Sequence, residues 1–163
     1  MIFVTVGTHE QAFNRLVQYM DEWAHEHDEE VVMQVGFSTY EPKYSTWKKM
    51  FSYQEMIKYI NEARIVITHG GPSSFIMPLQ VGKVPIVVPR KKQYDEHVND
   101  HQVTFCEAVK NRLKNIILVE DEKELEATID NYYSIVDSMT VTQQSNNSRF
   151  CAAFEKSVEE LVS

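Results

Sequence analysis

The segment Thr68–Ser74, with the sequence THGGPSS, has the residue types of an anion-binding turn. Gly70 and Gly71 allow the backbone to approach a ligand closely. The helical pattern that follows would add the free amides and positive dipole end of a helix N-terminus, and Ser73 and Ser74 add hydroxyl donors. The segment therefore predicts a phosphate site, with a plain tight turn capped by serine as the alternative.

A second glycine–hydroxyl turn, Gly7-Thr8, follows the first apolar run of the chain. Gly7 permits a close approach, and Thr8 can bond either helix amides or a ligand oxygen. The alternative is a simple helix N-cap, with Gln11 completing a capping box. If the two glycine turns face each other across one sheet edge, together they suit a diphosphate better than a single phosphate.

The third segment, Pro89–Gln102, has the sequence PRKKQYDEHVNDHQ and mixes cations, carboxylates, imidazoles and amides. Such a mixture suits the hydroxyls of a sugar. His97 and His101 are four residues apart and would share one face of a helix expected from about Glu96 to Lys110. That spacing can hold a metal, but the zincin pattern is not matched and no third ligand is evident. We therefore expect a hydroxyl-rich ligand and no metal, with a solvated helix start as the alternative.

His9 lies on the Gly7-Thr8 turn, where it can face the same cleft. It is a candidate base, although a histidine in such a loop more often has a capping role. Cys106 and Cys151 lack any partner pattern for nucleophilic catalysis. The cations Arg90, Lys91 and Lys92 are expected to lie beside the phosphate cleft.

Apolar runs alternate with helical patterns along the chain, which predicts an α/β fold with a parallel sheet and helices on both faces. Ligands in such sheets bind beyond the carboxyl ends of the strands, where the turns described above occur. The helices are expected from a capping box at Thr8, from another at Ser52 with Glu55, from Pro72, from about Glu96, and after Asp121. The expected strands are Ile2–Val6, Val31–Val35, a short piece near Trp47–Phe51, Arg64–Thr68, Val84–Val88 and Asn115–Val119.

Composition narrows the class of protein further. The chain has 163 residues, and 24 Asp+Glu against 16 Lys+Arg give it a net charge of -8. This length fits one domain, and the acidic balance opposes binding to nucleic acid or direct docking on anionic lipid. No apolar run has membrane-spanning length, the N-terminus lacks the pattern of a signal peptide, and two cysteines are no disulfide framework. We therefore expect a cytoplasmic protein.

Three segments in order, VTVGT, FSYQEMIKYINEARIVITHGG and GKVPIVVPRKKQYDEHVNDHQ, resemble the C-terminal, donor-binding half of glycosyltransferase family 28. Within it they look like the short bacterial proteins of capsule and exopolysaccharide synthesis known as β-1,4-galactosyltransferases. They are also similar to the catalytic subunit of the eukaryotic dolichol-linked GlcNAc transferase. The resemblance covers roughly residues 1–120. The chain departs from the wider pattern at Ser73, where many members have glycine, and at Met77, where many have a ribose-binding glutamate.

The resemblance implies a Rossmann-like domain, the C-terminal half of a GT-B glycosyltransferase, that binds a UDP-sugar without a metal or cofactor. The donor-binding domain is expected over 1–136. The residues of 137–148, DSMTVTQQSNNS, are typical of a linker or mobile loop, and an apolar helical stripe predicts a C-terminal helix over 149–163 that packs on the domain or on a partner. The matched binding positions are Gly7 and Thr8 near the phosphates, His69, Gly70, Gly71, Ser73 and Ser74 in the diphosphate loop, Met50 and Phe51 against the uracil, and His101 and Gln102 at the sugar hydroxyls.

The function implied is inverting transfer of a sugar, with UDP-galactose as the expected donor, to a lipid-diphosphate-linked saccharide. His9, Glu96 and His97 are the candidate bases. A full GT-B enzyme has two domains, so a membrane-anchored partner subunit is expected to supply the acceptor half and to recruit the chain to the inner face of the membrane. The alternatives are a non-catalytic nucleotide-sugar-binding regulatory subunit and an epimerase-like enzyme that acts on UDP-sugar without an acceptor.

Overall fold

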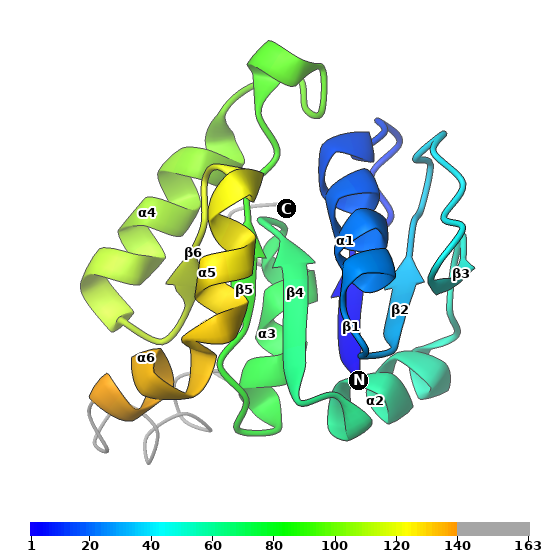
Figure 1. Cartoon of the computed structure of the whole chain (residues 1–163). Coiled ribbons are helices and arrows are strands. Elements are labelled where there is room, and N and C mark those ends of the chain that lie inside the picture. Colours follow the sequence, from blue (N-terminus) through cyan, green and yellow to red (C-terminus); the bar gives the residue numbers. More distant parts are fainter. Residues whose placement is uncertain (140–163) are drawn as a thin grey trace.

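A parallel six-stranded sheet forms the centre of the computed structural model, which describes residues 1–139 (Figure 1). Its order is β3-β2-β1-β4-β5-β6, and every neighbouring pair is parallel. The predicted α/β class is confirmed, and the expected strands are present with ends shifted by a few residues. Their bounds are β1 Ile2–Thr5, β2 Val31–Gln34, β3 Thr46–Lys48, β4 Ile65–His69, β5 Ile86–Val88 and β6 Ile117–Leu118.

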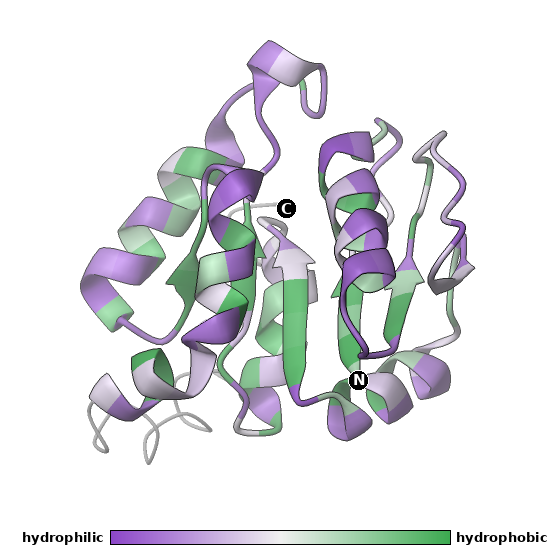
Figure 2. Cartoon of the chain, in the orientation of Figure 1, coloured by the Kyte–Doolittle hydropathy of each residue, from purple (hydrophilic) through white to green (hydrophobic). Residues whose placement is uncertain are grey.

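Helices cover both faces of the sheet, which explains why its central strands are apolar along their whole length. On one face, Leu16 and Met20 of α1 and Leu125 of α5 pack in one cluster with Val4 of β1. On the other face, α2 packs on Phe3, while α3 and α4 pack on β5. Figure 2 shows the strands in green and the outer sides of the helices largely in purple. The helices are α1 Asn14–Glu26, α2 Tyr53–Glu62, α3 Pro72–Gln80, α4 His101–Leu113, α5 Leu125–Asp130 and α6 Tyr132–Ser138.

Several predicted helix boundaries are confirmed. Ser52 and Glu55 form the reciprocal capping box at the start of α2. Pro72 occupies the first turn of α3, and Gly82 takes a left-handed φ of 79° just after that helix ends. Asp121 caps the 3₁₀ turn Glu122–Glu124 that precedes α5, accepting a hydrogen bond from the Lys123 amide.

The expected start of the first helix is wrong. Helix α1 begins at Asn14 and not near Thr8, so there is no Thr8–Gln11 capping box. Gly7 has a left-handed φ of 74°, which turns the chain away from a helical path. The Phe13 amide is instead bonded to the hydroxyl of Ser38, so the loop before α1 is fixed by a tertiary contact.

The expected helix from about Glu96 is also too long at its start. Helix α4 begins at His101, after the 3₁₀ turn η1 Lys92–Tyr94 and a left-handed Asp95 with a φ of 57°. His97 therefore precedes the helix, and His97 and His101 do not share a helical face.

The C-terminal expectations lie largely outside the described residues. Residues 137 and 138 of the expected linker form the end of α6, whereas 140–148 and the expected helix over 149–163 are not described. Within residues 1–139, no helix is long and apolar enough to span a membrane.

Candidate functional site

The strand order reverses direction between β1 and β4, which are hydrogen-bonded neighbours. The chain leaves β1 toward β2 on one side and later enters β4 on the other, so the two loops at their carboxyl ends diverge and leave a crevice. The Gly7 turn follows β1 and the Gly70–Ser74 turn follows β4, as the diphosphate hypothesis requires. A cavity of about 490 Å³ opens there, lined by Gly7, Thr8, His9, Gln34, Phe51, Tyr53, Met56, His69, Ser73, Ser74, Met77 and Gln102.

The N-terminus of α3 forms one wall of this cavity. Gly71 is the N-cap and has no side-chain cap. Pro72 has no amide hydrogen, and the amides of Ser74 and Phe75 donate to the Gly71 carbonyl at 3.0 and 3.3 Å. The Ser73 amide is therefore the first-turn donor without an acceptor among the described residues. Ser73 is exposed and Ser74 is nearly buried, and both line the cavity. None of the described lining residues is a carboxylate, so the wall presents donors without a competing negative charge.

The imidazole of His69 lies between the two glycine turns. A Cβ atom at Gly7 would overlap His69 Nε2, and one at Gly71 would overlap the adjacent Cε1. A Cβ at Gly70 would come within 3.0 Å of Gln102 Cβ. These glycines were expected to make room for a ligand; in the structure, His69 already requires Gly7 and Gly71, and Gln102 and Cys106 crowd Gly70.

His69 is neutral at physiological pH. Burial, reinforced by the positive charge of Arg90, lowers the pKa of its imidazole to about 3. Its Nε2 atom lies 2.9 Å from Ser74 Oγ. A neutral imidazole keeps one nitrogen as a donor and one as an acceptor, so its hydrogen bonds have a defined direction.

Arg90 is fully buried and joins three segments at the site. Its guanidinium donates to the carbonyls of Val6 at 2.7 Å, Gln11 at 2.7 Å and Glu96 at 3.1 Å. Burial lowers the pKa of Arg90 to about 10, still well above physiological pH. We expected Arg90, Lys91 and Lys92 beside the phosphate cleft, but among the described residues none of the three lines the cavity.

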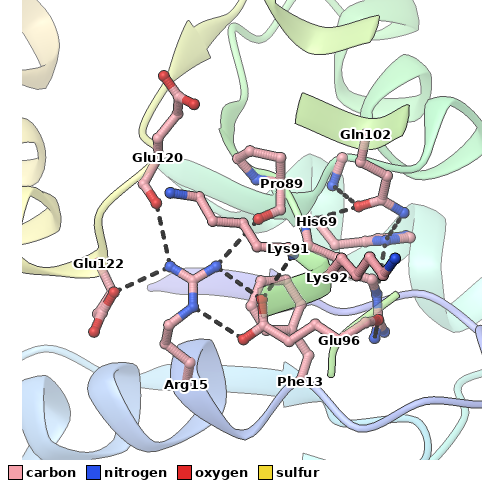
Figure 3. A network of polar contacts seen from close by, with 12 residues as sticks. Phe13, Arg15, His69, Pro89, Lys91, Lys92, Glu96, Gln102, Glu120 and Glu122 are labelled. Carbon is pink, nitrogen blue, oxygen red and sulfur yellow. Dashed lines mark hydrogen bonds and ion pairs between the residues drawn. The ribbon is translucent and has the colours of Figure 1, made fainter. Parts of the chain in front are cut away.

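Glu96 belongs to an ionic network centred on Arg15 (Figure 3). Both carboxylate oxygens accept from Arg15, at 2.9 Å each, and one also accepts from the Lys91 amide. Arg15 also pairs with Glu122 at 3.0 Å and donates to the carbonyl of Pro89. Burial alone would lower the pKa of Arg15, but Glu96 and Glu122 outweigh it and raise that pKa. The network fixes the loop after β5, and Glu96 is absent from the described cavity lining.

His9 and His97 stack face to face, with ring centroids 4.5 Å apart and planes 8° apart. His9 lines the cavity, whereas His97 lies half-buried beside it and is not among the described lining residues. Burial, followed by the neighbouring His9 and Arg90, lowers the pKa of His97. Of the three candidate bases, His9 alone is among the residues that line the cavity.

The cavity lining also includes aromatic side chains. Phe51 lines the cavity and packs against Phe3 and Tyr59, with ring centroids 6.0 and 5.1 Å apart. Its amide donates to Gln34 Oε1 at 2.9 Å, and Gln34 Nε2 donates to Thr5 at 3.0 Å. The backbone at Phe51 is therefore held to the carboxyl ends of β1 and β2. Met50, expected here too, is 40% exposed and outside the described lining.

Gln102 and His101 occupy different environments, although they are adjacent. Gln102 lines the cavity, but its Oε1 already accepts from the amides of Gly70 at 3.1 Å and Arg90 at 3.0 Å. His101 is exposed and is not among the lining residues. No group of three His, Cys, Asp or Glu side chains placed to hold a metal ion was found within residues 1–139.

Four lining residues were not predicted as site residues: Gln34, Tyr53, Met56 and Met77. Gln34 carried a usable signal, because a glutamine within the apolar run VVMQV needs a buried polar partner. Tyr53 and Met56 were assigned to the helical pattern of α2. Their exposure to the cavity depends on how α2 packs against α3, which its local sequence does not reveal.

A doubly covered parallel sheet with a donor-rich cavity at its switch point defines the class of nucleotide-binding α/β domains. The model of the glycosyltransferase family 28 C-terminal domain matches residues 1–162. The chain therefore belongs to this family and is the sugar-donor-binding half of a GT-B glycosyltransferase fold. No sequence of a curated protein matches the chain.

Solved glycosyltransferase structures share the fold. The glycosyltransferase of kitacinnamycin has a TM-score of 0.66 and 17% identity over 94% of this chain and 39% of its own. SnogD from Streptomyces nogalater has a TM-score of 0.59 and 15% identity, with 99% of this chain and 42% of SnogD covered. The calicheamicin glycosyltransferase CalG4 has a TM-score of 0.61 and 12% identity, with 98% of this chain and 40% of CalG4 covered. The chain thus spans about two-fifths of the length of each of these structures.

Proposed function

We propose that the chain binds the UDP moiety of a UDP-sugar in the cavity between β1 and β4 and presents the sugar for transfer. The observation that carries this proposal is the carboxylate-free lining that brings the N-terminus of α3 and the aromatic side chain of Phe51 to one cavity. A helix N-terminus with two serines suits a diphosphate. Phe51, with Tyr53 beside it, offers apolar surface for a pyrimidine. UDP-galactose remains the donor that we expect.

Isothermal titration calorimetry of the purified chain against UDP, UMP and a panel of UDP-sugars tests this proposal. We expect saturable binding of UDP, with weaker binding of UMP because it lacks the second phosphate. Uridine is the matched control, since it fills the aromatic side without engaging α3. If no uridine nucleotide gives a titration, the proposed function is wrong.

In the proposed reaction, the acceptor hydroxyl attacks the anomeric carbon from the face opposite UDP. The new C–O bond forms as the bond from that carbon to the diphosphate oxygen breaks. The negative charge gained by UDP is then stabilised by the first turn of α3 and the Ser74 hydroxyl. A general base takes the proton of the acceptor hydroxyl.

His9 is the base that the geometry favours. Gln11 Nε2 donates to the carbonyl of Asp95 at 3.1 Å, which fixes the orientation of its amide and makes Gln11 Oε1 an acceptor. His9 Nε2, 2.9 Å from Gln11 Oε1, must therefore carry the hydrogen. The lone pair of neutral His9 is on Nδ1, the atom available to accept a proton.

We expect His9→Ala to lower sugar transfer by about 10²- to 10⁴-fold, the contribution of a typical general base, while UDP binding is retained. Transfer is measured with labelled UDP-sugar and membranes from a cell that makes the lipid-linked saccharide acceptor. Binding is measured by calorimetry. His25→Ala is the control. His25 stacks on Tyr44, and neither residue is part of the described cavity lining, so this variant should leave transfer unchanged. Undiminished transfer by His9→Ala would remove His9 as the base.

On the strength of the resemblance to the short bacterial proteins of capsule and exopolysaccharide synthesis, the acceptor half is proposed to come from a separate membrane-anchored subunit. That subunit would bring the chain to the inner face of the membrane and bind the lipid-linked saccharide. Purified chain alone should therefore bind UDP but transfer sugar weakly. Full transfer to a lipid acceptor without any partner would contradict this arrangement.

A further inference from the structure

Gln102 has only one amide orientation that satisfies its neighbours. Its Oε1 lies 3.1 Å from the Gly70 amide and 3.0 Å from the Arg90 amide, and both of these groups are donors. An exchange of oxygen and nitrogen would place an NH₂ group against two N–H groups. Gln102 Nε2 is therefore the atom that faces His69 Nδ1, at 3.4 Å.

His69 Nδ1 consequently faces donors alone. Besides Gln102 Nε2, the Nε–H of Arg90 points at it, also from 3.4 Å. Both contacts are long, but neither partner can accept a hydrogen, because an amide nitrogen and a guanidinium are donors. Nδ1 must hold the lone pair, so the hydrogen of this neutral imidazole is on Nε2.

The tautomer of His69 determines what the Ser74 hydroxyl can do. His69 Nε2–H donates to Ser74 Oγ at 2.9 Å, so the oxygen is used as an acceptor and its own hydrogen points elsewhere. No acceptor for that hydrogen is found among the described residues, and Ser74 lines the cavity. With the opposite tautomer, Ser74 would donate to His69 and offer the cavity only lone pairs, which repel an anion.

We propose that Gln102 and Arg90 fix the Nε2–H tautomer of His69 and thereby make Ser74 an obligatory hydrogen-bond donor to an anionic ligand in the cavity. The proposal rests on the proposed function in taking that anion to be the diphosphate of UDP. It makes Gln102 and His69 positioning residues, whereas the family resemblance implies a contact of Gln102 with the sugar hydroxyls. The pKa of about 3 supports a neutral ring throughout the physiological range.

The wild-type chain tests the first step without any substitution. Long-range ¹H–¹⁵N NMR correlations of the imidazoles distinguish the two neutral tautomers and the imidazolium, and the His69 signals are assigned by their loss in His69→Ala. We expect the Nε2–H form at neutral pH. An Nδ1–H form or an imidazolium would overturn the proposal, whether or not UDP binds.

Gln102→Glu tests the second step. The carboxylate can still accept from the Gly70 and Arg90 amides, but its second oxygen would face His69 Nδ1 as an acceptor. We expect His69 to become Nδ1–H or doubly protonated, and Ser74 to turn its hydrogen toward the ring or lose its defined direction. Gln34→Glu is the matched control. It adds the same charge to the same cavity, but Gln34 Nε2 faces the Thr5 hydroxyl, which can rotate to donate. In Gln34→Glu, His69 should therefore keep the Nε2–H form.

The UDP affinities of Ser74 and Gln102 variants test whether the His69 tautomer affects ligand binding. Ser74→Ala should weaken UDP binding by about 10- to 100-fold, the contribution of a hydrogen bond to a charged group. Gln102→Glu should weaken it at least as much. In a Ser74→Ala background, Gln102→Glu should cost less than in wild type, and the difference measures the coupling. Fully additive losses would overturn the link from Gln102 to Ser74.

The two proposals fail in different ways. If the wild-type chain shows the Nε2–H tautomer but binds no uridine nucleotide, the proposed function is wrong. If UDP binds and the His69 tautomer is Nδ1–H, the proposed function stands, and the proposal that Gln102 and Arg90 fix the Nε2–H tautomer is wrong. Should Gln102→Glu fail to fold, Gln102→Met removes the amide without adding a charge. Arg90 then remains as the only described donor to Nδ1, so the Nε2–H signal should persist and Ser74 should remain a donor; loss of that signal would contradict the role of Arg90.

Discussion

Replacing Arg90 with methionine should lower the free energy of unfolding by about 3 kcal/mol or more. The substitution keeps an apolar stem but removes all donors from the carbonyls of Val6, Gln11 and Glu96. Each buried carbonyl left without a partner costs about 1 kcal/mol or more. A domain of this size is stabilised by only about 5–15 kcal/mol, so the loss is a large fraction of the total. Urea unfolding followed by circular dichroism measures it.

Two further variants separate the bonds of Arg90 from its charge. Arg90→Lys keeps the charge but replaces a planar fork by a single ammonium, which cannot reach three chain segments at once. It should lose most of the same stability. Lys92→Met removes an equal charge from an exposed neighbour and should stay within about 0.5 kcal/mol of wild type. An Arg90→Met variant with wild-type stability would show that the three carbonyls find other partners.

Removal of the Arg90 guanidinium should also disturb the proposed UDP site. The Val6 carbonyl that it holds is adjacent to the Gly7 turn, and the Glu96 carbonyl belongs to the loop after β5. Arg90 also faces His69 Nδ1. One buried cation therefore holds β1, β4 and the loop after β5 together at the mouth of the crevice, and we expect UDP affinity and stability to fall together.

The sheet was predictable because its signals are local. Continuous β-branched runs such as those of β1 and β4 require cover on both faces, and the glycine turns that follow them mark their carboxyl ends. In a parallel sheet the carboxyl ends of the strands share one edge, so the sequence already predicts that the two turns lie there. The capping box at Ser52 and the first-turn Pro72 were equally readable, because their partners lie within three residues.

The starts of α1 and α4 were not predictable in the same way, because they depend on distant partners. Residues 8–13 are held by Ser38 and by the contact of Gln11 with Asp95. Glu96 is drawn away from a helical position by Arg15. Such tertiary bonds outweigh a helical pattern of only a few residues. The same limit applies to Arg90, whose local sequence, PRKKQ, resembles an exposed basic loop and gives no sign of complete burial.

The site was predicted at the level of segments and less well at the level of atoms. The Gly7 turn and the residues His69, Ser73 and Ser74 of the second turn line one cavity, together with His9, Phe51 and Gln102. Gly70 and Gly71 are buried and are not among the described lining residues. His69 was predicted to bind the ligand. In the structure its imidazole also fills the space next to Gly7 and Gly71, where a Cβ atom would overlap it. A sequence reveals that a glycine is needed; it does not reveal whether a ligand or another side chain occupies the space.

Gly7→Ala addresses that question directly. The new methyl group would overlap His69 Nε2, and the φ of 74° is strained for alanine. His69 is buried and held by Ser74, Arg90 and Gln102, so it has little freedom to move. Strain of about 1–2 kcal/mol and overpacking of about 1–3 kcal/mol should together lower the free energy of unfolding by about 2–5 kcal/mol. Displacement of His69 from Ser74 should also weaken UDP binding, by about as much as Ser74→Ala does, 10- to 100-fold.

Gly82→Ala is the matched control, because Gly82 has nearly the same φ, 79°, and a Cβ there would meet nothing within 4 Å. It should show the backbone strain alone, with UDP affinity unchanged. The difference between the two alanine variants therefore measures the contact with His69. In a His69→Ala background the methyl group at position 7 has room, and Gly7→Ala should then lose no more stability than Gly82→Ala. If Gly7→Ala is as mild as Gly82→Ala in the wild-type background as well, the imidazole does not occupy the space between the glycine turns, and the positioning of Ser74 by His69 loses its structural basis.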